Sequence, residues 1–435
     1  MAQASPSQSL LWSGDRAVPK FAHLADCHLG ANREPVLQEM EIAAFATAMD
    51  ACIEEGVDFI LVAGDLFHAN IPDLAVVNEA VKRMKQVRDR GIPFYVAYGS
   101  HDYSPTETSI IDILQSAGLI TKIMKATVED DKVKLHFTTD PKTGAKIAGL
   151  SGRKLGLERE YFEILDRTSL EKAPGFKIFT FHSAIAELKP EYLARMDAVP
   201  ASYLPKGFAY YAGGHLHEKL EGRLPGLESI NYPGPLFSGY PRDLEQIAQG
   251  THRGFFVVHF DDQVEKVEFR EIPTVASLYF EYDAGGKSAA QAKQELLSRL
   301  QKLEVQGKLA VLKIRGQLSG GSTAEINSSE IRAALYQKGA LYVTLNKHGV
   351  TSREFQAVKV AGEDIPTIEN ALFRENIGTV KVATKALQGD SGVRLATGLL
   401  KLLRQEPKPN EKKKDYEERV IRGAIQALHL EERGT

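Results

Sequence analysis

Five short polar clusters lie in the first half of the chain, and each contains side chains that bind metal ions or transfer protons. In chain order they are Asp26-Cys-His28, Gly64-Asp-Leu-Phe-His68, Gly99-Ser-His-Asp102, His182 and Gly214-His-Leu-His217. A mixture of carboxylate and neutral imidazole suits Mn²⁺, Fe or Zn²⁺, whereas oxygen ligands alone suit Mg²⁺ or Ca²⁺ better. Two such ions roughly 4 Å apart can clamp an in-line attack on phosphorus and generate the attacking hydroxide. The clusters therefore indicate metal-assisted chemistry on a phosphate ester.

The spacing inside two of the clusters predicts that pairs of ligands converge. In an extended segment, residues i and i+2 point to the same side. We therefore expect Asp26 with His28, and His215 with His217, each to present two ligands to one point. Cys27 then points the other way, and we interpret it as a small buried hydrophobic residue.

Each cluster is a weak signal on its own, because a single histidine at a strand end is more often structural than a ligand. The remaining histidines are interpreted as ordinary core or surface residues: His23, His136, His252, His259, His348 and His429. Function is favoured because all five clusters lie at the ends of predicted strands. Side chains at the carboxyl ends of strands line the crevice in which α/β proteins bind ligands.

Apolar runs bounded by glycines and polar residues predict the strands that carry these clusters. Three of these strands alternate with helices: Lys20–Ala25, Val57–Ala63 and Ile92–Tyr98. Later strands are predicted at Lys146–Leu150, Phe176–Phe181, Phe208–Ala212, Gly254–Phe260 and Val264–Ile272. The first pattern predicts an α/β sheet with helical cover, and the second adds antiparallel neighbours. Together they favour a two-sheet sandwich with outer helices.

A domain boundary is expected near residues 272–276, and a self-contained α+β pattern follows it. Its strands are predicted at Leu278–Tyr282, Leu309–Arg315 and Leu341–Leu345, and its helices at Ser288–Leu303 and Ser328–Gln337. The tail has predicted amphipathic helices at Val393–Leu403 and Lys414–Leu430, joined by a charged linker at 405–414. The expected organisation is a loose tail at 1–18, a catalytic domain at 19–275, a small α+β domain at 276–360 and a helical tail at 361–435.

The composition limits the class of protein. With 435 residues and 43% hydrophobic content, the chain can bury a core in two or three domains. No apolar run reaches the roughly 18 residues that a membrane span needs. The two cysteines cannot form a disulfide framework, which fits a reducing cytosol. The formal net charge of −3 is unusual for a nucleic-acid binder, so contact with DNA would require local basic patches, metal ions or a partner.

Taken together, the motifs resemble the calcineurin-like metallophosphoesterase superfamily. Within it, Gly64-Asp-Leu-Phe-His68 and Asn231-Tyr-Pro-Gly-Pro-Leu-Phe-Ser-Gly239 are similar to the nuclease subunit of the meiotic-recombination-eleven/SbcD family of double-strand-break repair proteins. The loop His101-Asp-Tyr-Ser-Pro-Thr-Glu-Thr-Ser109 looks closest to archaeal members. The motifs that carry the resemblance lie between about residues 21 and 240. The unit at 278–355 resembles the capping domain of the family by position and layout. The tail resembles the tail of the family only in its general type.

The resemblance implies two divalent metal ions, which we expect to be Mn²⁺. One ion would be held by Asp26, His28, Asp65 and His217, and the second would share Asp65 and add Ser100, His182 and His215. Ser100 is the departure from the pattern, because most of the superfamily has an asparagine whose amide oxygen ligates the second ion. A serine hydroxyl is shorter and is a poorer ligand. We therefore expect the second ion to be bound more weakly or through water.

The resemblance also implies the remaining roles. His101 would protonate the leaving oxygen or steady the phosphate, and His68 would help to place the substrate. The chain would be a Mn²⁺-dependent endonuclease and 3′→5′ exonuclease on DNA ends, a homodimer, and the partner of an SbcC-type coiled-coil ATPase. The two tail helices would contact that ATPase, unless they pack on their own domain. A protein of this kind would act in the cytoplasm at a prokaryotic nucleoid, away from membranes.

Two other hypotheses remain open at the level of sequence. The same metal chemistry serves small-molecule phosphodiesterases and protein phosphatases, which would cleave small substrates and leave DNA intact. A scaffold that binds DNA or the ATPase, with a metal site weakened by Ser100, would bind fewer metal ions. The retention of His101 argues against the scaffold, because a protein without catalysis needs no general acid beside its metals.

Overall fold

The computed structural model describes residues 18–102, 108–153, 157–352, 365–379, 387–408, 411 and 413–428. The expected loose tail at 1–18 therefore lies outside the described residues, except for its last position. Residues 103–107 of the loop after His101 and the end of the second predicted tail helix also lie outside them. Internal contacts divide the chain into two units. Unit 1 is Met1–Tyr279, Val305–Val311 and Ala340–Tyr342, and unit 2 is Phe280–Glu304, Leu312–Gly339 and Val343–Thr435.

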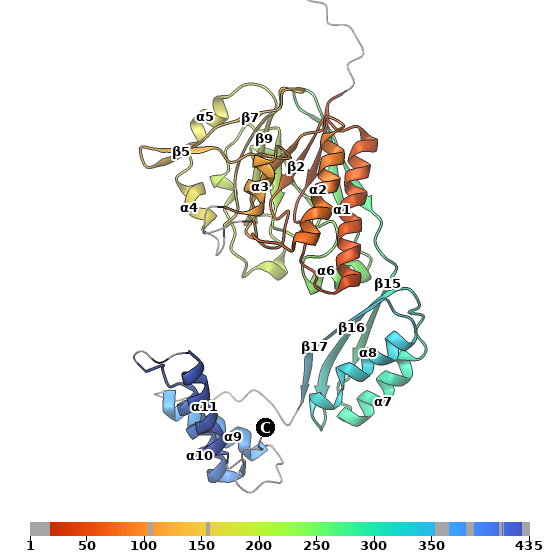
Figure 1. Ribbon diagram of the computed structural model, residues 1–435, viewed down its shortest axis with the longest axis vertical. Coiled ribbons are helices and arrows are strands. Elements are labelled where there is room, and N and C mark those ends of the chain that lie inside the picture. The colour runs from red at the N-terminus through yellow and green to blue at the C-terminus, as the bar shows by residue number, and fades with distance from the viewer. Residues whose placement is uncertain are drawn as a thin grey trace, which may run out of the picture. The chain divides into compact units, whose positions relative to one another are not determined.

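Two six-stranded sheets form the centre of unit 1 (Figure 1). The first has the order β14 (Val264–Ile272), β13 (Arg253–Phe260), β1 (Lys20–Leu24), β2 (Phe59–Ala63), β3 (Phe94–Ala97) and β4 (Thr121–Lys122). The second has the order β11 (Leu220–Leu224), β12 (Leu227–Tyr232), β10 (Tyr210–Gly214), β9 (Lys177–His182), β8 (Lys146–Leu150) and β7 (Thr138–Thr139). The central strands β1–β4 are mutually parallel, and so are β8, β9, β10 and β12. The predicted two-sheet sandwich is confirmed.

An aromatic layer lies between the two sheets and holds them together. The rings of Phe21 and Phe59 on the first sheet stack at 5.0 Å, and Phe21 meets the edge of Tyr210 on the second sheet at 5.3 Å. Phe260 of β13 stacks on Phe176, which precedes β9, at 4.1 Å. These strands are covered on both faces, which is why their sequences are continuous apolar runs.

Helices cover the outer faces of both sheets. On the first sheet these are α1 (Pro35–Glu55), α2 (Leu74–Arg88), α3 (Ile110–Ser116) and α6 (Pro241–Ala248), which pack into one core with β1, β2 and β3. On the second sheet α4 (Glu158–Glu163) and α5 (Arg167–Lys172) contribute Phe162 and Leu170 to a separate core. The sequence predicted the two long helices, but not α3 to α6. Helices of six to eight residues are too short to show an apolar period.

The strands and helices predicted after the expected boundary are present. The three-stranded sheet has the order β15 (Ser277–Asp283), β16 (Leu309–Leu318) and β17 (Tyr342–Ser352), with the helices α7 (Ala289–Leu300) and α8 (Ser328–Gln337). Both helices begin at a capping residue, since Ser288 and Asn327 accept hydrogen bonds from backbone amides of the first turn. Asn327 and Ser288 are the local signals that fix these helix starts.

Three helices follow in the tail: α9 (Ile365–Thr379), α10 (Gly389–Leu403) and α11 (Lys413–Ala427). α10 packs against both α9 and α11. The sequence predicted α10 and α11 but treated the region of α9 as irregular. Of the predicted charged linker at 405–414, residues 405–408 and 411 are described and are not helical, whereas its last two residues already belong to α11. Within the described parts of the chain, the helices are too short or too polar to cross a membrane.

Candidate metal centre

The polar clusters come together at one edge of unit 1, where the carboxyl ends of the parallel strands of both sheets meet. Asp26 follows β1, Asp65 follows β2 and Ser100 follows β3. On the second sheet, His182 is the last residue of β9, and its register partner on β10 is Gly214, directly before His215. The neighbouring sheets therefore deliver ligands from both sides to one crevice.

The backbone at these strand ends is turned and not extended. Asp26, His28, Asp65 and His215 have φ angles of 52°, 47°, 51° and 89°. The expectation that Asp26 and His28 converge because they alternate along an extended segment was therefore wrong. The same holds for His215 with His217. The ligands converge because each strand turns sharply, and the turns are held by bonds such as His28 N–H to the Asp65 carbonyl at 2.9 Å. Left-handed residues other than glycine cost about 1–3 kcal/mol each and cluster at functional sites.

Glycines at two strand ends allow the backbone to approach the ligands closely. A Cβ atom on Gly99 would lie 2.0 Å from the Asp65 carboxylate, and one on Gly214 would lie 2.0 Å from the carbonyl oxygen of Ala63. Both distances are far below van der Waals contact. Glycine at position 99 therefore lets the turns after β2 and β3 of the first sheet lie close together, and glycine at position 214 lets the second sheet approach β2 of the first.

A first group of candidate ligands consists of Asp26, His28 and His217, whose donor atoms all lie within 4.8 Å of one another. The Nε2 atoms of His28 and His217 are 3.0 Å apart. His217 Nδ1 lies 2.9 Å from a carboxylate oxygen of Asp243, which can only accept, so Nδ1 donates and the Nε2 lone pair faces the group. Asp65 completes the set, with its carboxylate 3.7 Å from His28 Nε2.

A second group consists of Asp26, Asp65 and His182, again within 4.8 Å. His182 Nδ1 donates to the carbonyl oxygen of Ala63 at 2.8 Å, so Nε2 is the ring nitrogen that faces the carboxylates. That Nε2 atom is buried and lies 3.0 Å from Asp65 Oδ2. The two atoms are close, but they are not aligned as a hydrogen bond, and Nε2 has no other hydrogen-bond partner among the described residues. A lone pair facing a carboxylate oxygen is repulsive unless a proton or a cation lies between them.

The electrostatics of the cluster favour a proton or a cation between these groups. Burial by itself lowers the pKa of His182, yet the neighbouring Asp65 and Asp26 raise it to about 10. Burial raises the pKa of Asp26 to about 6, although His182 and His217 oppose it. For Asp65, burial is outweighed by the imidazoles of His182 and His28, and the pKa is lowered. Buried carboxylates and converging imidazole nitrogens are a donor set that fits divalent transition-metal ions.

His215 and Ser100 lie beside the second group. The backbone amide of His215 donates to both carboxylate oxygens of Asp26 at 3.0 Å, and its ring lies 5.3 Å from the ring of His182. Ser100 Oγ lies 3.5 Å from Asp65 Oδ2. Both residues line the pocket over the ligands. The structure thus places Ser100 where its hydroxyl is near the shared carboxylate but does not reach further into the group.

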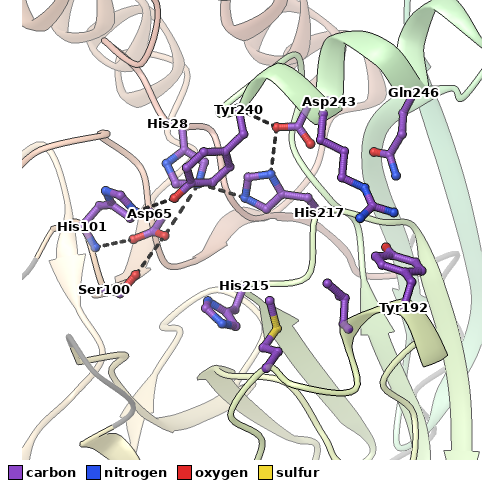
Figure 2. Close-up of a pocket in the computed structure, with 13 residues that line it drawn as sticks. His28, Asp65, Ser100, His101, Tyr192, His215, His217, Tyr240, Asp243 and Gln246 are labelled. Carbon is purple, nitrogen blue, oxygen red and sulfur yellow. Dashed lines mark hydrogen bonds and ion pairs between the residues drawn. The ribbon is translucent and has the colours of Figure 1, made fainter. Parts of the chain in front are cut away.

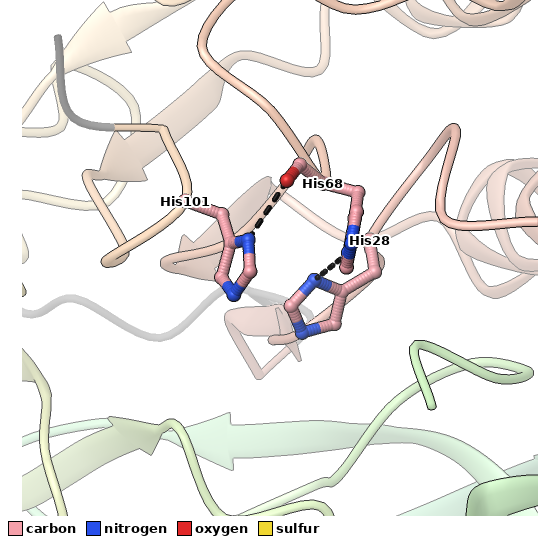
Figure 3. Close-up of side chains that lie close together, drawn as sticks. All are labelled: His28, His68 and His101. Carbon is pink, nitrogen blue, oxygen red and sulfur yellow. Dashed lines mark hydrogen bonds between the residues drawn. The ribbon is translucent and has the colours of Figure 1, made fainter. Parts of the chain in front are cut away.

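His68 and His101 form a third cluster with His28 (Figure 3). The rings of His68 and His101 stack at 4.6 Å, and the Nδ1 atoms of His68 and His28 are 3.3 Å apart. His101 is fixed at its backbone, where the amide donates to Asp65 Oδ1 at 2.8 Å, and at Nδ1, which donates to the carbonyl oxygen of His68 at 2.8 Å. Every site residue predicted from the sequence therefore lies in this one centre.

Several supporting residues were not predicted. The Asp243 carboxylate accepts from the amides of Gly239 and Tyr240 at 2.9 and 2.8 Å, which caps α6, and the same oxygen orients His217. Arg253 is buried and donates to the carbonyl oxygen of His217 at 2.8 Å. Proline at the start of α6 and Asp243 two positions later are a helix-start signature that the sequence does contain. The contact with His217 has no sequence signal.

Asp102 and Tyr240 are further residues whose role comes only from the structure. The buried Asp102 carboxylate accepts from the amides of Leu66, Phe67 and Gly99 at 3.0–3.3 Å, which ties the turn after β2 to the turn after β3. The Tyr240 hydroxyl lies 2.8 Å from His101 Nε2. Asp102 belonged to a predicted motif but had no assigned role.

A pocket of about 370 Å³ opens over the centre (Figure 2). It is lined by His28, Asp65, Ser100, His101, Tyr192, Leu193, Met196, His215, His217, Tyr240, Arg242, Asp243 and Gln246. The candidate ligands occupy one side. Tyr192, Leu193 and Met196 add apolar surface to the lining, and Arg242 lies over the Tyr192 ring at 3.7 Å. A phosphate ester entering this pocket would meet the imidazoles and carboxylates directly.

Comparison with known proteins agrees with this geometry. Residues 19–219 match the family described as calcineurin-like phosphoesterase. The chain is similar to the proteins named "DNA double-strand break repair protein Mre11" from three archaea. It is 28% identical to that of Archaeoglobus fulgidus over 58% of this chain and 60% of the relative. For Sulfurisphaera tokodaii the identity is 31% over 49% and 53%, and for Methanopyrus kandleri 23% over 90% and 84%. The chain thus spans little more than half the length of the first two relatives.

Replacing Asp243 by asparagine tests whether this carboxylate orients His217 for a metal. We expect Asp243→Asn to weaken Mn²⁺ binding by about 10- to 100-fold, the usual effect of removing an outer partner of a metal-bound histidine. The measurement is titration calorimetry with Mn²⁺. Asp112→Asn is the matched control, because Asp112 has the same capping position in α3 but contacts Ser109, Tyr98 and Lys122. Equal losses in both variants would refute the role of Asp243.

Replacing Ser100 by asparagine tests the weak second site. The amide oxygen of asparagine reaches further than the serine hydroxyl, which now lies 3.5 Å from Asp65 Oδ2. We expect Ser100→Asn to tighten binding of the second Mn²⁺ ion about tenfold and to leave the first unchanged. Metal content after dialysis against graded Mn²⁺ gives the stoichiometry at each concentration. An unchanged second affinity would show that Ser100 does not limit it.

Proposed function

We propose that this chain is a metal-dependent DNA exonuclease and endonuclease that processes the ends of double-strand breaks. The observation that carries the proposal is the pair of ligand groups that share Asp65 and Asp26 beneath a pocket with His101 at its rim. The names of the archaeal relatives supply the substrate, since they are double-strand-break repair proteins. The ligand groups beneath the pocket support hydrolysis of a phosphodiester as the chemistry.

The residues have distinct roles in this proposal. One ion would be held by Asp26, His28, Asp65 and His217, and the other by Asp65, His182 and His215 with Ser100 nearby. Bound there, two divalent ions, with Mn²⁺ expected, would supply Lewis acidity and an activated water. His101 would serve as the proton donor for the leaving oxygen, because its Nδ1 is held by a carbonyl and only Nε2 faces the pocket side. His68 would steady the phosphate beside it.

The other parts of the chain fit a repair nuclease by layout. The small α+β unit at 276–360 would be the capping domain and would contribute to DNA binding. The tail at 361–435 would contact a coiled-coil ATPase of the SbcC type. Supporting this, Leu403 of α10 and Ile421 of α11 remain 64% and 57% exposed although the tail helices pack on one another. Such a protein would work at the nucleoid in the cytoplasm of a prokaryote.

We also propose a homodimer that uses an apolar patch on α2 and α3. Leu74, the first residue of α2, is 78% exposed, Ile71 in the segment before it is 80% exposed, and Ile113 of α3 is 56% exposed. The two regions are joined by a hydrogen bond from the Ile110 amide to the Asn70 carbonyl at 3.2 Å. Exposed apolar side chains gathered in this way mark interaction surfaces.

The nuclease itself is tested with a labelled linear DNA duplex. We expect cleavage in Mn²⁺ that stops in EDTA, because the ligands can act on phosphorus only through bound ions. His101→Ala should reduce the rate by about 100-fold or more, since it removes the general acid. Absence of DNA cleavage, together with hydrolysis of a small phosphodiester, would instead support a small-molecule phosphodiesterase.

The dimer is tested by placing a charge in the apolar patch. We expect Ile113→Asp combined with Leu74→Asp to convert the protein to a monomer, because two carboxylates would be buried in the interface. Light scattering after size exclusion gives the molar mass. Val128→Asp is the control, since Val128 is 70% exposed on the separate hairpin of β5 (Ala126–Glu129) and β6 (Lys132–Leu135). A wild-type protein that is already monomeric at micromolar concentration would refute this interface.

A further inference from the structure

Tyr240 lies across the rim of the candidate metal centre and reaches His101 (Figure 2). Its hydroxyl is 2.8 Å from His101 Nε2, and its ring lies 5.1 Å from the ring of His217 and 5.6 Å from that of His28. The side chain is 43% exposed and lines the pocket. Its hydroxyl therefore engages the one ring nitrogen of His101 that is not held by the His68 carbonyl.

The position of Tyr240 is fixed by the network that orients His217. A single oxygen of Asp243 accepts from His217 Nδ1 at 2.9 Å and from the Tyr240 amide at 2.8 Å. The Tyr240 carbonyl in turn accepts from Ser238 Oγ at 3.1 Å. The Asp243 carboxylate thus fixes the backbone of Tyr240 and the ring of His217 at the same time. The contact between the Tyr240 hydroxyl and His101 is therefore part of the same hydrogen-bond network as a candidate ligand.

Both ring nitrogens of His101 are already engaged. Nδ1 donates to the His68 carbonyl, and Nε2 is bonded to the Tyr240 hydroxyl. For His101 to protonate a leaving oxygen directly, it would first have to break its bond to Tyr240. A phenol oxygen carries one proton and two lone pairs, so it can accept from Nε2 and donate to substrate at the same time.

We propose that Tyr240 is a catalytic residue through which the proton of His101 reaches the leaving oxygen. This inference rests on the proposed phosphodiester hydrolysis. As water attacks phosphorus and the bond from phosphorus to the leaving oxygen breaks, Tyr240 O–H donates its proton to that oxygen. Tyr240 takes the Nε2 proton of the His101 imidazolium, which becomes neutral imidazole. The products are a phosphate monoester and an alcohol, the attacking water loses its proton to solvent, and His101 regains one from solvent.

The experiment compares two leaving groups in Mn²⁺. Thymidylyl-thymidine releases an alkoxide that needs a proton, whereas the p-nitrophenyl ester of thymidine 5′-monophosphate releases a phenolate that does not. We expect Tyr240→Phe to lower kcat on the first substrate by about 100-fold and on the second by less than about threefold. His101→Ala should show the same split. The double variant should lose no more than either single variant, because the two residues act as one unit.

Tyr203→Phe is the control for loss of a tyrosine hydroxyl, because Tyr203 bonds Glu163 at 3.4 Å and does not line the pocket. It should leave both rates unchanged. Equal losses on the two substrates in Tyr240→Phe would overturn the relay, since that pattern means that Tyr240 only positions groups. Retention of both rates would also overturn it. Failure of the wild-type protein on both substrates with every divalent metal would overturn the proposed function, and the relay with it.

Discussion

The burial of two carboxylates among converging imidazoles is the constraint on which the rest of the site depends. Asp26 and Asp65 are 0% and 2% exposed, and an uncompensated buried charge is very costly. His182 and His217 use Nδ1 as a donor to other groups and turn Nε2 towards these carboxylates, where a proton or a cation can lie between them. A bound cation would neutralise the buried carboxylate charge. The burial of Asp26 and Asp65 therefore destabilises the metal-free protein and at the same time favours metal binding.

The fold meets this constraint by bringing two sheets together at the carboxyl ends of their parallel strands. Left-handed turns at Asp26, His28 and Asp65 direct the side chains inward, and Gly214 lacks the Cβ atom that would keep the two sheets apart. The aromatic layer between the sheets fixes their spacing, which sets the distance between ligands on opposite sheets. Stability and metal binding are thus linked, because a shift of one sheet would separate His182 from Asp65.

Hydrogen bonds from outside the ligand set do the fine positioning. Asp102 joins the turns after β2 and β3, while Asp243 joins α6, Tyr240 and His217. Each of these carboxylates satisfies backbone amides and orients functional groups at the same time. Asp243 can orient His217 because its carboxylate is already held in place by the backbone amides at the start of α6.

The sequence by itself determined which side chains gather at the centre, the sandwich of two sheets, and the order of the long helices. It could do so because ligand type, apolar runs and helical periods are local properties. It did not determine how the ligands converge, since the left-handed φ of His28 depends on bonds to the turn after β2. The short helix α6 and the roles of Asp243, Arg253 and Tyr240 were decided only by the tertiary structure. Their partners lie tens of residues or more away along the chain, and the contact of Tyr240 with His101 exists only because the fold brings these distant segments together.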